Sequence, residues 1–332
     1  MSEPLRTEIA ALVGSLFPGA RVEPIAGDAS TRRFHRIHPP SGPSWIVMDY
    51  GAPFEGETDD IRMTGIFEAA GLPVARIRHV APAAGCLVLE DLGPRTLEAA
   101  LSQGAVGGEE SRDRLYSRAV TLALAVATRG TAALSLSPRA SEPALDAGRF
   151  RFEMDFFLEH YALGLEAQRA LPPGLAPALY GLAEGAASCA RPVLCHRDYH
   201  SRNLMVRADG SLAMVDIQDA RRGPLGYDLA SLVHDAYVEL GEELAGRLVE
   251  DFRSGLPDPP SRDEFHDRLA VIAAQRMIKA LGTFGFQAHV LGRHHYLEGV
   301  PRTLARLAVL LPSFPATAPV AEQLRAAGLL PS

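Results

Sequence analysis

Lysine is almost absent from the sequence. Lys279 is the one lysine among 33 lysine and arginine side chains, so every other position of this kind is arginine. Any binding or catalytic step that needs a lysine earlier in the chain is therefore excluded.

Cysteine, basic blocks and long apolar runs are also scarce. The three cysteines form no CxxC pair, and their odd number argues against a zinc cluster or a disulfide framework and favours a reducing cytoplasm. With 40 acidic against 33 basic residues and no basic stripe, nucleic acid is a poor candidate partner. We expect no membrane-spanning helix, because no uncharged apolar run reaches about 18 residues. Nothing in the sequence implies a protein partner.

The first part of the chain has the pattern of a small β-rich lobe. Turn-forming clusters separate short extended runs, which predict a β-meander over residues 21–26, 33–38 and 44–49. A short amphipathic helix is expected at 5–17, and another from a cap at Thr58 to about Ala70, where Gly71 and Pro73 end it. A short buried strand is expected from Cys86 to Leu89.

After Thr96 the spacing of apolar residues is helical. Helical stretches are predicted at Met154–Leu165, Ala230–Val249 and Phe265–Leu281, with one β insertion from Val193 to Ile217. The fold class is therefore α+β with two lobes. A small antiparallel β lobe with one helix is expected at residues 1–91, and a larger, mainly helical lobe at residues 92–332.

The β insertion holds the residues that suggest chemistry. Asp209-Gly210 is typical of a two-residue hairpin turn, and that turn would place Asn203 directly opposite Asp216. An amide oxygen and a carboxylate make a hard-oxygen site suited to Mg²⁺, which recruits waters and phosphate oxygens as further ligands. Asp198, at the start of the same loop, could orient a substrate hydroxyl and accept its proton.

This pattern, HxDxxxxN followed by a strand-terminal Asp, resembles the catalytic loop and metal-binding Asp of protein-kinase-like phosphotransferases. Four residues match it: His196, Asp198, Asn203 and Asp216. The resemblance implies that Asp198 is the base, that His196 holds the loop and that the other two bind Mg²⁺. The plainer alternative is a polar loop, a turn asparagine and an edge aspartate, but the joint spacing favours the kinase interpretation.

Within that superfamily the chain is similar to the aminoglycoside phosphotransferase family of Mg-ATP-dependent small-molecule kinases. The likeness rests on segments spread over most of the chain, among them Trp45–Asp49, Leu89–Gly93, His196–Val206, Val215–Ala220, Tyr227–Leu229 and Gln275–Gly282. It implies a bilobal protein-kinase-like fold with ATP and Mg²⁺ as cofactors. Residues 1–91 would then bind the nucleotide, and residues 92–332 would contain a catalytic loop at 195–220 and the acceptor-site helices. The turn Gly27, Asp28, Ala29 and Ser30 would cover the nucleotide. The backbone of Leu89, Glu90 and Asp91 would form the hinge that meets adenine.

One departure from the kinase pattern concerns the phosphates. The third strand should present a lysine, but this chain has Met48 and Asp49 there. Arg32, Arg33 and Arg62 are the available cations, because a guanidinium can bind phosphate in a bidentate way. We favour Arg33; an ordinary solvated strand residue is an equally simple interpretation.

The acceptor is predicted from charge. Residues 268–297 contain no Asp or Glu, and their basic side chains after Arg268 are Arg276, Lys279, His289, Arg293, His294 and His295. Such a lining suits a neutral or anionic acceptor. The resemblance implies that the reaction is phosphorylation of the anomeric hydroxyl of N-acetylmuramate or N-acetylglucosamine, as in cell-wall precursor recycling. Sugar contacts are predicted from Arg202, Gln218, Asp219, Arg276 and Lys279. Alternatively, these charges could simply face water.

Two rival functions remain at this point. The first is another small-molecule kinase of the same group with an aminoglycoside or amino-alcohol acceptor. The second is a non-catalytic nucleotide-binding module, which the missing third-strand lysine suggests.

Overall fold

The structure is a computed structural model that describes residues 4–25, 32–102, 108–137, 140, 144–167, 170–188 and 192–331. The chain divides into two compact units. Met1–Arg95 and Met205–Asp219 form the N-terminal unit, and Thr96–Leu204 and Ala220–Ser332 form the C-terminal unit. The division differs from the predicted one by grouping Met205–Asp219, part of the predicted catalytic loop, with the first segment.

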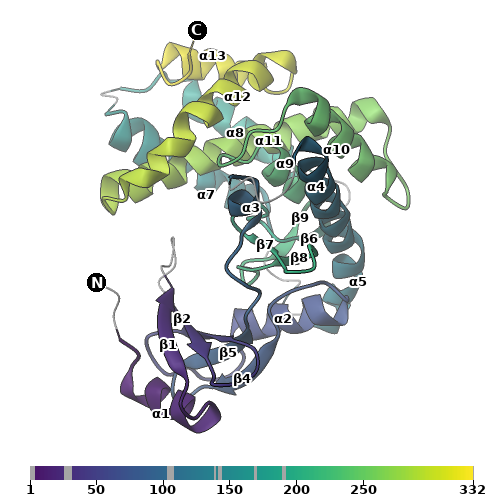
Figure 1. The fold of residues 1–332 in the computed structure, drawn as a ribbon. Coiled ribbons are helices and arrows are strands. Elements are labelled where there is room, and N and C mark those ends of the chain that lie inside the picture. Colours follow the sequence, from purple (N-terminus) through teal and green to yellow (C-terminus); the bar gives the residue numbers. More distant parts are fainter. Residues whose placement is uncertain are drawn as a thin grey trace. The chain divides into compact units, whose positions relative to one another are not determined.

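The N-terminal unit is built on a five-stranded antiparallel sheet with strand order β1-β2-β3-β5-β4 (Figure 1). Its elements are α1 (Thr7–Leu16), β1 (Arg21–Ile25), β2 (Arg33–His38), β3 (Trp45–Asp49), α2 (Asp59–Ala69), β4 (Ile77–Ala81) and β5 (Cys86–Glu90). The antiparallel lobe predicted from the sequence is confirmed, and α1 and α2 lie within the two helical stretches predicted at 5–17 and from Thr58 to about Ala70. The edge strand β4 was missed because Arg78 and His79 interrupt its apolar pattern.

The first helix, α1, covers one face of this sheet. Val13 and Phe17 from the helix segment pack in one buried cluster with Ile37 of β2, Val47 of β3 and Val88 of β5. Side chains alternate between the two faces along a strand. This cluster therefore assigns each strand residue of the sheet to the face that α1 covers or to the opposite face.

Helix α2 begins where the sequence predicts. The Thr58 hydroxyl accepts a bond from the Ile61 N–H at 3.4 Å, as an N-cap residue should, and Gly71 after the helix has a φ of 65°.

The hairpin of β7 (Leu204–Val206) and β8 (Leu212–Met214) has a different turn from the one predicted. The Gly210 N–H donates to the Arg207 carbonyl, and the Arg207 N–H donates to the Ser211 carbonyl, both at 2.9 Å. This is a three-residue loop with Gly210 in the left-handed region, at φ 77°. The extra residue moves the register by one, so the predicted pairing of Asn203 directly opposite Asp216 is wrong.

The C-terminal unit is mainly helical (Figure 1). Its helices are α3 (Leu97–Ser102), α4 (Gly108–Ala125), α5 (Thr131–Ala133), α7 (Ala147–Phe157), α8 (Leu175–Ala187), α9 (Tyr227–Val233), α10 (Glu242–Ser254), α11 (Arg262–Gly285), α12 (Val300–Ser313) and α13 (Ala318–Ala326). Wider or tighter helical turns form η1 (Val126–Gly130), η2 (Leu134–Leu136), η3 (Leu158–Leu165), η4 (Phe286–Val290) and η5 (His294–Gly299). Strands β6 (Pro192–Cys195) and β9 (Arg221–Pro224) pair antiparallel.

Helix α11 runs through the middle of this unit and packs against α7, α8, α9 and α12. Its buried residues include Ile272, Met277 and Ile278. Close contact with α7 and η3 depends on small residues, because a Cβ at Gly282 or Gly285 would lie within 3.0 Å of the backbone of Phe157 or His160. The sequence predicts this helix correctly and shorter than it is.

The helix predicted over Ala230–Val249 is wrong, because the chain leaves the helix after Val233 and resumes it at Glu242. Arginines of α12 donate hydrogen bonds to backbone carbonyls of the segment between α9 and α10. Arg302 donates to Ala236 at 2.6 Å, and Arg306 donates to Asp235 and Val238 at 2.5 and 3.1 Å. These bonds satisfy the backbone outside a helix, so the segment can bend toward the pocket described below.

Two helical stretches, 112–136 and 262–290, are long and apolar enough to cross a membrane by length and composition. The second contains α11, whose apolar side chains are buried within the C-terminal unit. Core helices of this kind pass the same test, so the stretches are weak evidence for a membrane span.

Candidate active site

The loop after β6 is fixed by one buried carboxylate. Asp228, at the start of α9, accepts hydrogen bonds from the backbone N–H groups of His196 at 2.7 Å and Arg197 at 3.0 Å. Arg197 has a φ of 81°, a left-handed conformation that a non-glycine residue adopts only at a cost. Burial raises the pKa of Asp228 despite these bonds. The position of Asp228 before an apolar helix suggests that it either caps that helix or orients the loop. These two bonds show that it orients the loop.

The Arg197 side chain anchors the same loop to α7. Its Nη2 lies 3.3 Å from Oε1 of Glu153 on α7, whose side chain is 4% exposed. Gln275 of α11 donates to the other carboxylate oxygen at 2.9 Å. The loop backbone is thus tied to α7, α9 and α11, which are the packed core of the unit.

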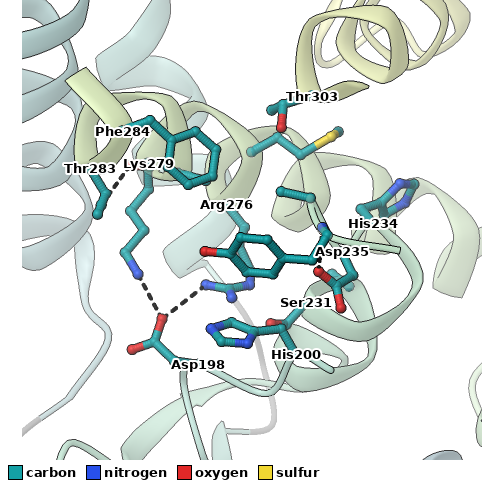
Figure 2. A pocket seen from close by; sticks show the side chains of 15 residues that line it. Asp198, His200, Ser231, His234, Asp235, Arg276, Lys279, Thr283, Phe284 and Thr303 are labelled. Carbon is teal, nitrogen blue, oxygen red and sulfur yellow. Dashed lines mark hydrogen bonds and ion pairs between the residues drawn. The ribbon is translucent and has the colours of Figure 1, made fainter. Parts of the chain in front are cut away.

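Asp198 projects from this loop toward α11, where two cations meet it (Figure 2). Lys279 donates to its Oδ1 at 2.8 Å, and Nη1 of Arg276 lies 3.6 Å from the same atom. Burial alone would raise the pKa of Asp198, but Lys279, Arg276 and Arg197 outweigh it and hold the pKa well below its usual value. Asp198 is therefore a carboxylate at neutral pH, and its side chain is 25% exposed.

Asn203 closes the loop on itself. Its Nδ2 donates to the Asp198 carbonyl at 2.9 Å, so its amide oxygen is the atom suited to a cation. The His200 N–H reaches the same carbonyl at 3.1 Å. Burial lowers the pKa of His200 to about 4, although Asp235 and Asp198 act in the opposite direction. His200 is thus neutral at pH 7, which fits a structural or hydrogen-bonding role better than a role as a cation.

A pocket of about 100 Å³ opens beside Asp198, wholly within the C-terminal unit (Figure 2). Its polar lining consists of Asp198, His200, Ser231, His234, Asp235, Tyr237, Arg276, Lys279, Thr283 and Thr303, and its apolar lining includes Met277 and Phe284. Among the described residues, Ser231 Oγ and His200 Nδ1 are buried without a hydrogen-bond partner. Such groups could bond to a polar ligand.

Asp216 belongs to the N-terminal unit, just after β8. It also has a left-handed backbone, with φ 63°, and its Oδ1 accepts a bond from Gln218 Nε2 at 2.9 Å. Within the described residues no group of three or more His, Cys, Asp or Glu could hold a metal ion. The donor chemistry of Asp216 and Asn203 fits Mg²⁺, which prefers few protein oxygens and completes its shell with water and phosphate.

The other predicted contacts are more structural than expected. Arg202 forms a two-bond ion pair with Glu98, at 2.9 and 3.1 Å, and stacks over Tyr237 with 3.7 Å from Cζ to the ring centre. Gln218 also bonds Asp219, at 3.4 Å, besides Asp216. Their roles as sugar contacts stay predictions. Of the six basic groups predicted to line the acceptor site, Arg276 and Lys279 lie in the pocket, while the three histidines are exposed.

The predicted hinge lies at the end of β5. Asp91 accepts bonds from Arg36 at 2.7 Å and Ser44 at 2.6 Å, and the Glu90 side chain lies 3.5 Å from Arg207. These contacts hold the segment but do not test whether its backbone meets adenine. The predicted nucleotide-covering turn, Gly27 to Ser30, lies outside the described residues.

Sequence reasoning missed the groups that support the loop. Glu153 lies in a stretch that also holds Arg151 and Asp155, Asp235 follows His234, and nothing in their spacing marks either carboxylate. Asp235 accepts bonds from the N–H groups of Ser201 and Tyr237, both at 2.8 Å.

Comparisons with known proteins identify the family of the chain. The model of the phosphotransferase enzyme family, APH, matches residues 21–265. A relative from Pseudomonas aeruginosa, N-acetylmuramate/N-acetylglucosamine kinase, is 30% identical over 92% of this chain and 88% of its own length. A protein of the same name from Neisseria meningitidis is 29% identical over 84% of this chain and 82% of its own.

Solved structures show the same fold at low identity. Choline kinase LicA from Streptococcus pneumoniae superposes with a TM-score of 0.59 at 14% identity, covering 90% of this chain and 98% of that one. The ADP-bound aminoglycoside phosphotransferase APH(2'')-Ib gives a TM-score of 0.56 at 13% identity, covering 90% and 97%. The predicted protein-kinase-like fold is therefore confirmed. The family match spans more than half of the chain, and the chain belongs to the phosphotransferase enzyme family, whose members transfer phosphate to a hydroxyl group.

Proposed function

We propose that this enzyme transfers the γ-phosphate of ATP to the anomeric hydroxyl of N-acetylmuramate or N-acetylglucosamine. The observation that carries the proposal is the pocket beside Asp198, in which a carboxylate is held by Lys279 and Arg276. The names of the curated relatives, at 27 to 30% identity, support the same acceptors. The proposal includes a cytoplasmic location, where ATP is available, and a role in cell-wall precursor recycling.

Asp198 would accept the proton of the sugar hydroxyl. A carboxylate with a depressed pKa is a weak base, but phosphoryl transfer depends mainly on positioning and electrostatics. An anomeric hydroxyl is more acidic than an ordinary alcohol, which eases the transfer. Lys279 fixes the Asp198 carboxylate by a 2.8 Å bond, so the second oxygen would be directed at the acceptor.

The nucleotide side would use Mg²⁺. Asn203 and Asp216 would hold the ion, and when bound it would neutralise charge on the transferring phosphoryl group. Gln218, which donates to Asp216, would orient that ligand.

The charge of the pocket supports an uncharged or anionic acceptor over a polycation. Two carboxylates line it, but both are already engaged. Asp198 accepts from Lys279, and Asp235 accepts from the backbone of Ser201 and Tyr237. A cationic aminoglycoside or choline would meet Lys279 and Arg276 instead. N-acetylmuramate, with its lactyl carboxylate, is complementary to these two cations.

A panel of acceptors tests the proposal. Purified protein with Mg-ATP should release ADP with N-acetylmuramate and N-acetylglucosamine and should not do so with kanamycin or choline. Asp198→Asn serves as the inactive control, which excludes contaminating kinases. ADP release with choline or kanamycin alone would overturn the acceptor assignment. Nucleotide binding without any transfer to the panel would favour the non-catalytic module.

A further inference from the structure

The proposed kinase needs a cation for the nucleotide phosphates, and its third strand has none. Asp49, one of the two residues at the lysine position, is 1% exposed, and its carboxylate accepts three bonds from Arg6, the shortest at 2.7 Å. Asp49 therefore belongs to the α1 side of the sheet. Met48, its neighbour, points to the opposite face.

Arg33 also lies on the face that α1 covers. It shares the alternation of Ile37, which packs in the α1 cluster, and it pairs across the strands with Asp49. Its charge lowers the pKa of Asp49, in addition to the larger effect of Arg6. Arg33 is thus directed at the structural ion pair of α1 and not at the Met48 face. Arg62 forms its ion pairs with Glu57 and Asp59, two exposed carboxylates.

Arg32 occupies the Met48 face. Its Nη1 lies 3.6 Å from the Met48 sulfur and 2.6 Å from Oδ1 of Asp60 in the first turn of α2. The side chains of the pair are 19% and 15% exposed. Tyr50 donates from its hydroxyl to the other oxygen of Asp60 at 2.8 Å. A cation on the Met48 face is therefore held by a carboxylate from the helix that follows the third strand.

The Asp60 carboxylate also interacts electrostatically with Asp216, the predicted metal ligand in this unit. Burial is the main cause that raises the pKa of Asp60, Arg32 and the Tyr50 hydroxyl oppose it, and the charge of Asp216 adds to the rise. The Arg32–Asp60 pair thus lies within electrostatic reach of the residue that would hold Mg²⁺, where nucleotide phosphates would be.

We propose that Arg32 is the residue that binds the β-phosphate of the nucleotide, and that Asp60 positions it. The inference rests on the proposed use of ATP. In protein kinases a third-strand lysine is held by a glutamate of the following helix. Here the guanidinium of the residue just before β2 lies beside the Met48 sulfur and pairs with Asp60, so the ion pair is rebuilt from different positions. A guanidinium has five N–H donors and can contact the carboxylate and phosphate oxygens together.

Nucleotide binding without acceptor tests this assignment, so the result does not depend on which sugar is phosphorylated. Calorimetry would measure the Kd of ATP, ADP and adenosine for wild type, Arg32→Ala, Arg32→Lys, Arg33→Ala and the surface control Arg21→Ala. Loss of a charge-assisted phosphate contact should raise the Kd of ATP and ADP about 10- to 100-fold in Arg32→Ala. The Kd of adenosine should change by less than about twofold, Arg32→Lys should recover part of the loss, and the control should match wild type.

A structural role for Arg32 would give a different result. In a folded variant it would weaken the binding of adenosine and ATP together, and that outcome would overturn the proposal. So would a phosphate-specific loss in Arg33→Ala with Arg32→Ala unaffected, or a wild-type protein that binds no ATP. If Arg32→Ala alone leaves Asp60 unpaired and unfolds the unit, Arg32→Ala/Asp60→Asn removes that charge, and the same phosphate-specific loss is expected. A protein that passes this test but phosphorylates no amino sugar would contradict the proposed function alone.

Discussion

Each unit of the molecule contains a carboxylate paired with cations, and the two respond to burial in opposite ways. In the C-terminal unit, Lys279, Arg276 and Arg197 outweigh burial and lower the pKa of Asp198. In the N-terminal unit, burial outweighs the cation Arg32 and the Tyr50 hydroxyl and raises the pKa of Asp60, with Asp216 adding to the rise. The number of cations around a carboxylate, more than burial alone, decides which charge state is stabilised.

The difference corresponds to the two proposed roles. A group that accepts a proton must remain a carboxylate, and Asp198 is surrounded by positive charge that ensures this. Asp60, which would position Arg32 beside the nucleotide phosphates, has the negative charge of Asp216 nearby. The carboxylate form of Asp60 is therefore stabilised less well until further positive charge enters its surroundings.

Removing the Asp198 carboxylate should have the largest effect. Asp198→Asn keeps the shape of the side chain but cannot accept a proton, so kcat should fall about 100- to 10,000-fold. Steady-state ADP release would measure it. Unchanged binding of ATP and an unchanged melting temperature are the matched controls. Activity within tenfold of wild type would show that Asp198 is not the base.

Removing one cation should make Asp198 behave more like Asp60. Lys279→Met deletes the 2.8 Å bond and a charge that lowers the pKa of Asp198, so that pKa should rise. The carboxylate is the active form, and kcat/KM should therefore begin to fall at a higher pH on the acid side than in wild type. At neutral pH the loss should be about 10- to 100-fold because the carboxylate also loses its orientation. Lys279→Arg should restore the acid side of the profile; the same profile in all three proteins would contradict this role of Lys279.

A smaller change is expected when the positioning group of the N-terminal unit is neutralised. Asp60→Asn keeps the hydrogen bond to Arg32 but removes the charge, so the KM for ATP should rise about 3- to 10-fold while kcat changes less. Tyr50→Phe, which removes one bond to Asp60, should give a milder rise. A fall in kcat with an unchanged KM for ATP would argue against a positioning role on the nucleotide side.

The smallest effect concerns acid stability of the C-terminal unit. Burial lowers the pKa of His234 to about 4, with Arg306 acting in the same direction, and an unfolded histidine titrates near 6.5. The unfolded state therefore binds more protons between these values, so the free energy of unfolding should decrease as the pH falls from about 6.5 to about 4. His234→Gln should flatten that slope in melting curves. An equal slope in both proteins would show that His234 is not responsible.

Local patterns in the sequence predict the elements well where a cap or turn has a clear signature. Thr58 caps α2 as expected, and β2 begins at Arg33 and ends at His38, as its extended run indicates. The hairpin turn shows the limit of such rules. Asp209-Gly210 fits a two-residue turn in sequence, but Ala208 joins the loop, and one added residue changes the register of the whole hairpin.

The site could be predicted only as far as its residues lie together in the sequence. The motif from His196 to Asn203 identifies the loop, but Glu153, Gln275 and Asp228 hold it from three different helices. The choice between Arg32 and Arg33 could not be made from the sequence, because adjacent strand residues differ only in the face to which they point. The cluster that packs against α1 shows which face of the sheet Arg33 lies on.

The position of the transferred phosphate tests the central claim most directly. Protein, Mg-ATP and N-acetylmuramate or N-acetylglucosamine would be followed by phosphorus NMR with proton coupling. The account predicts a new phosphomonoester resonance coupled to the anomeric proton of the sugar, absent with Asp198→Asn. A phosphate on any other hydroxyl, or no sugar phosphate at all, would contradict it.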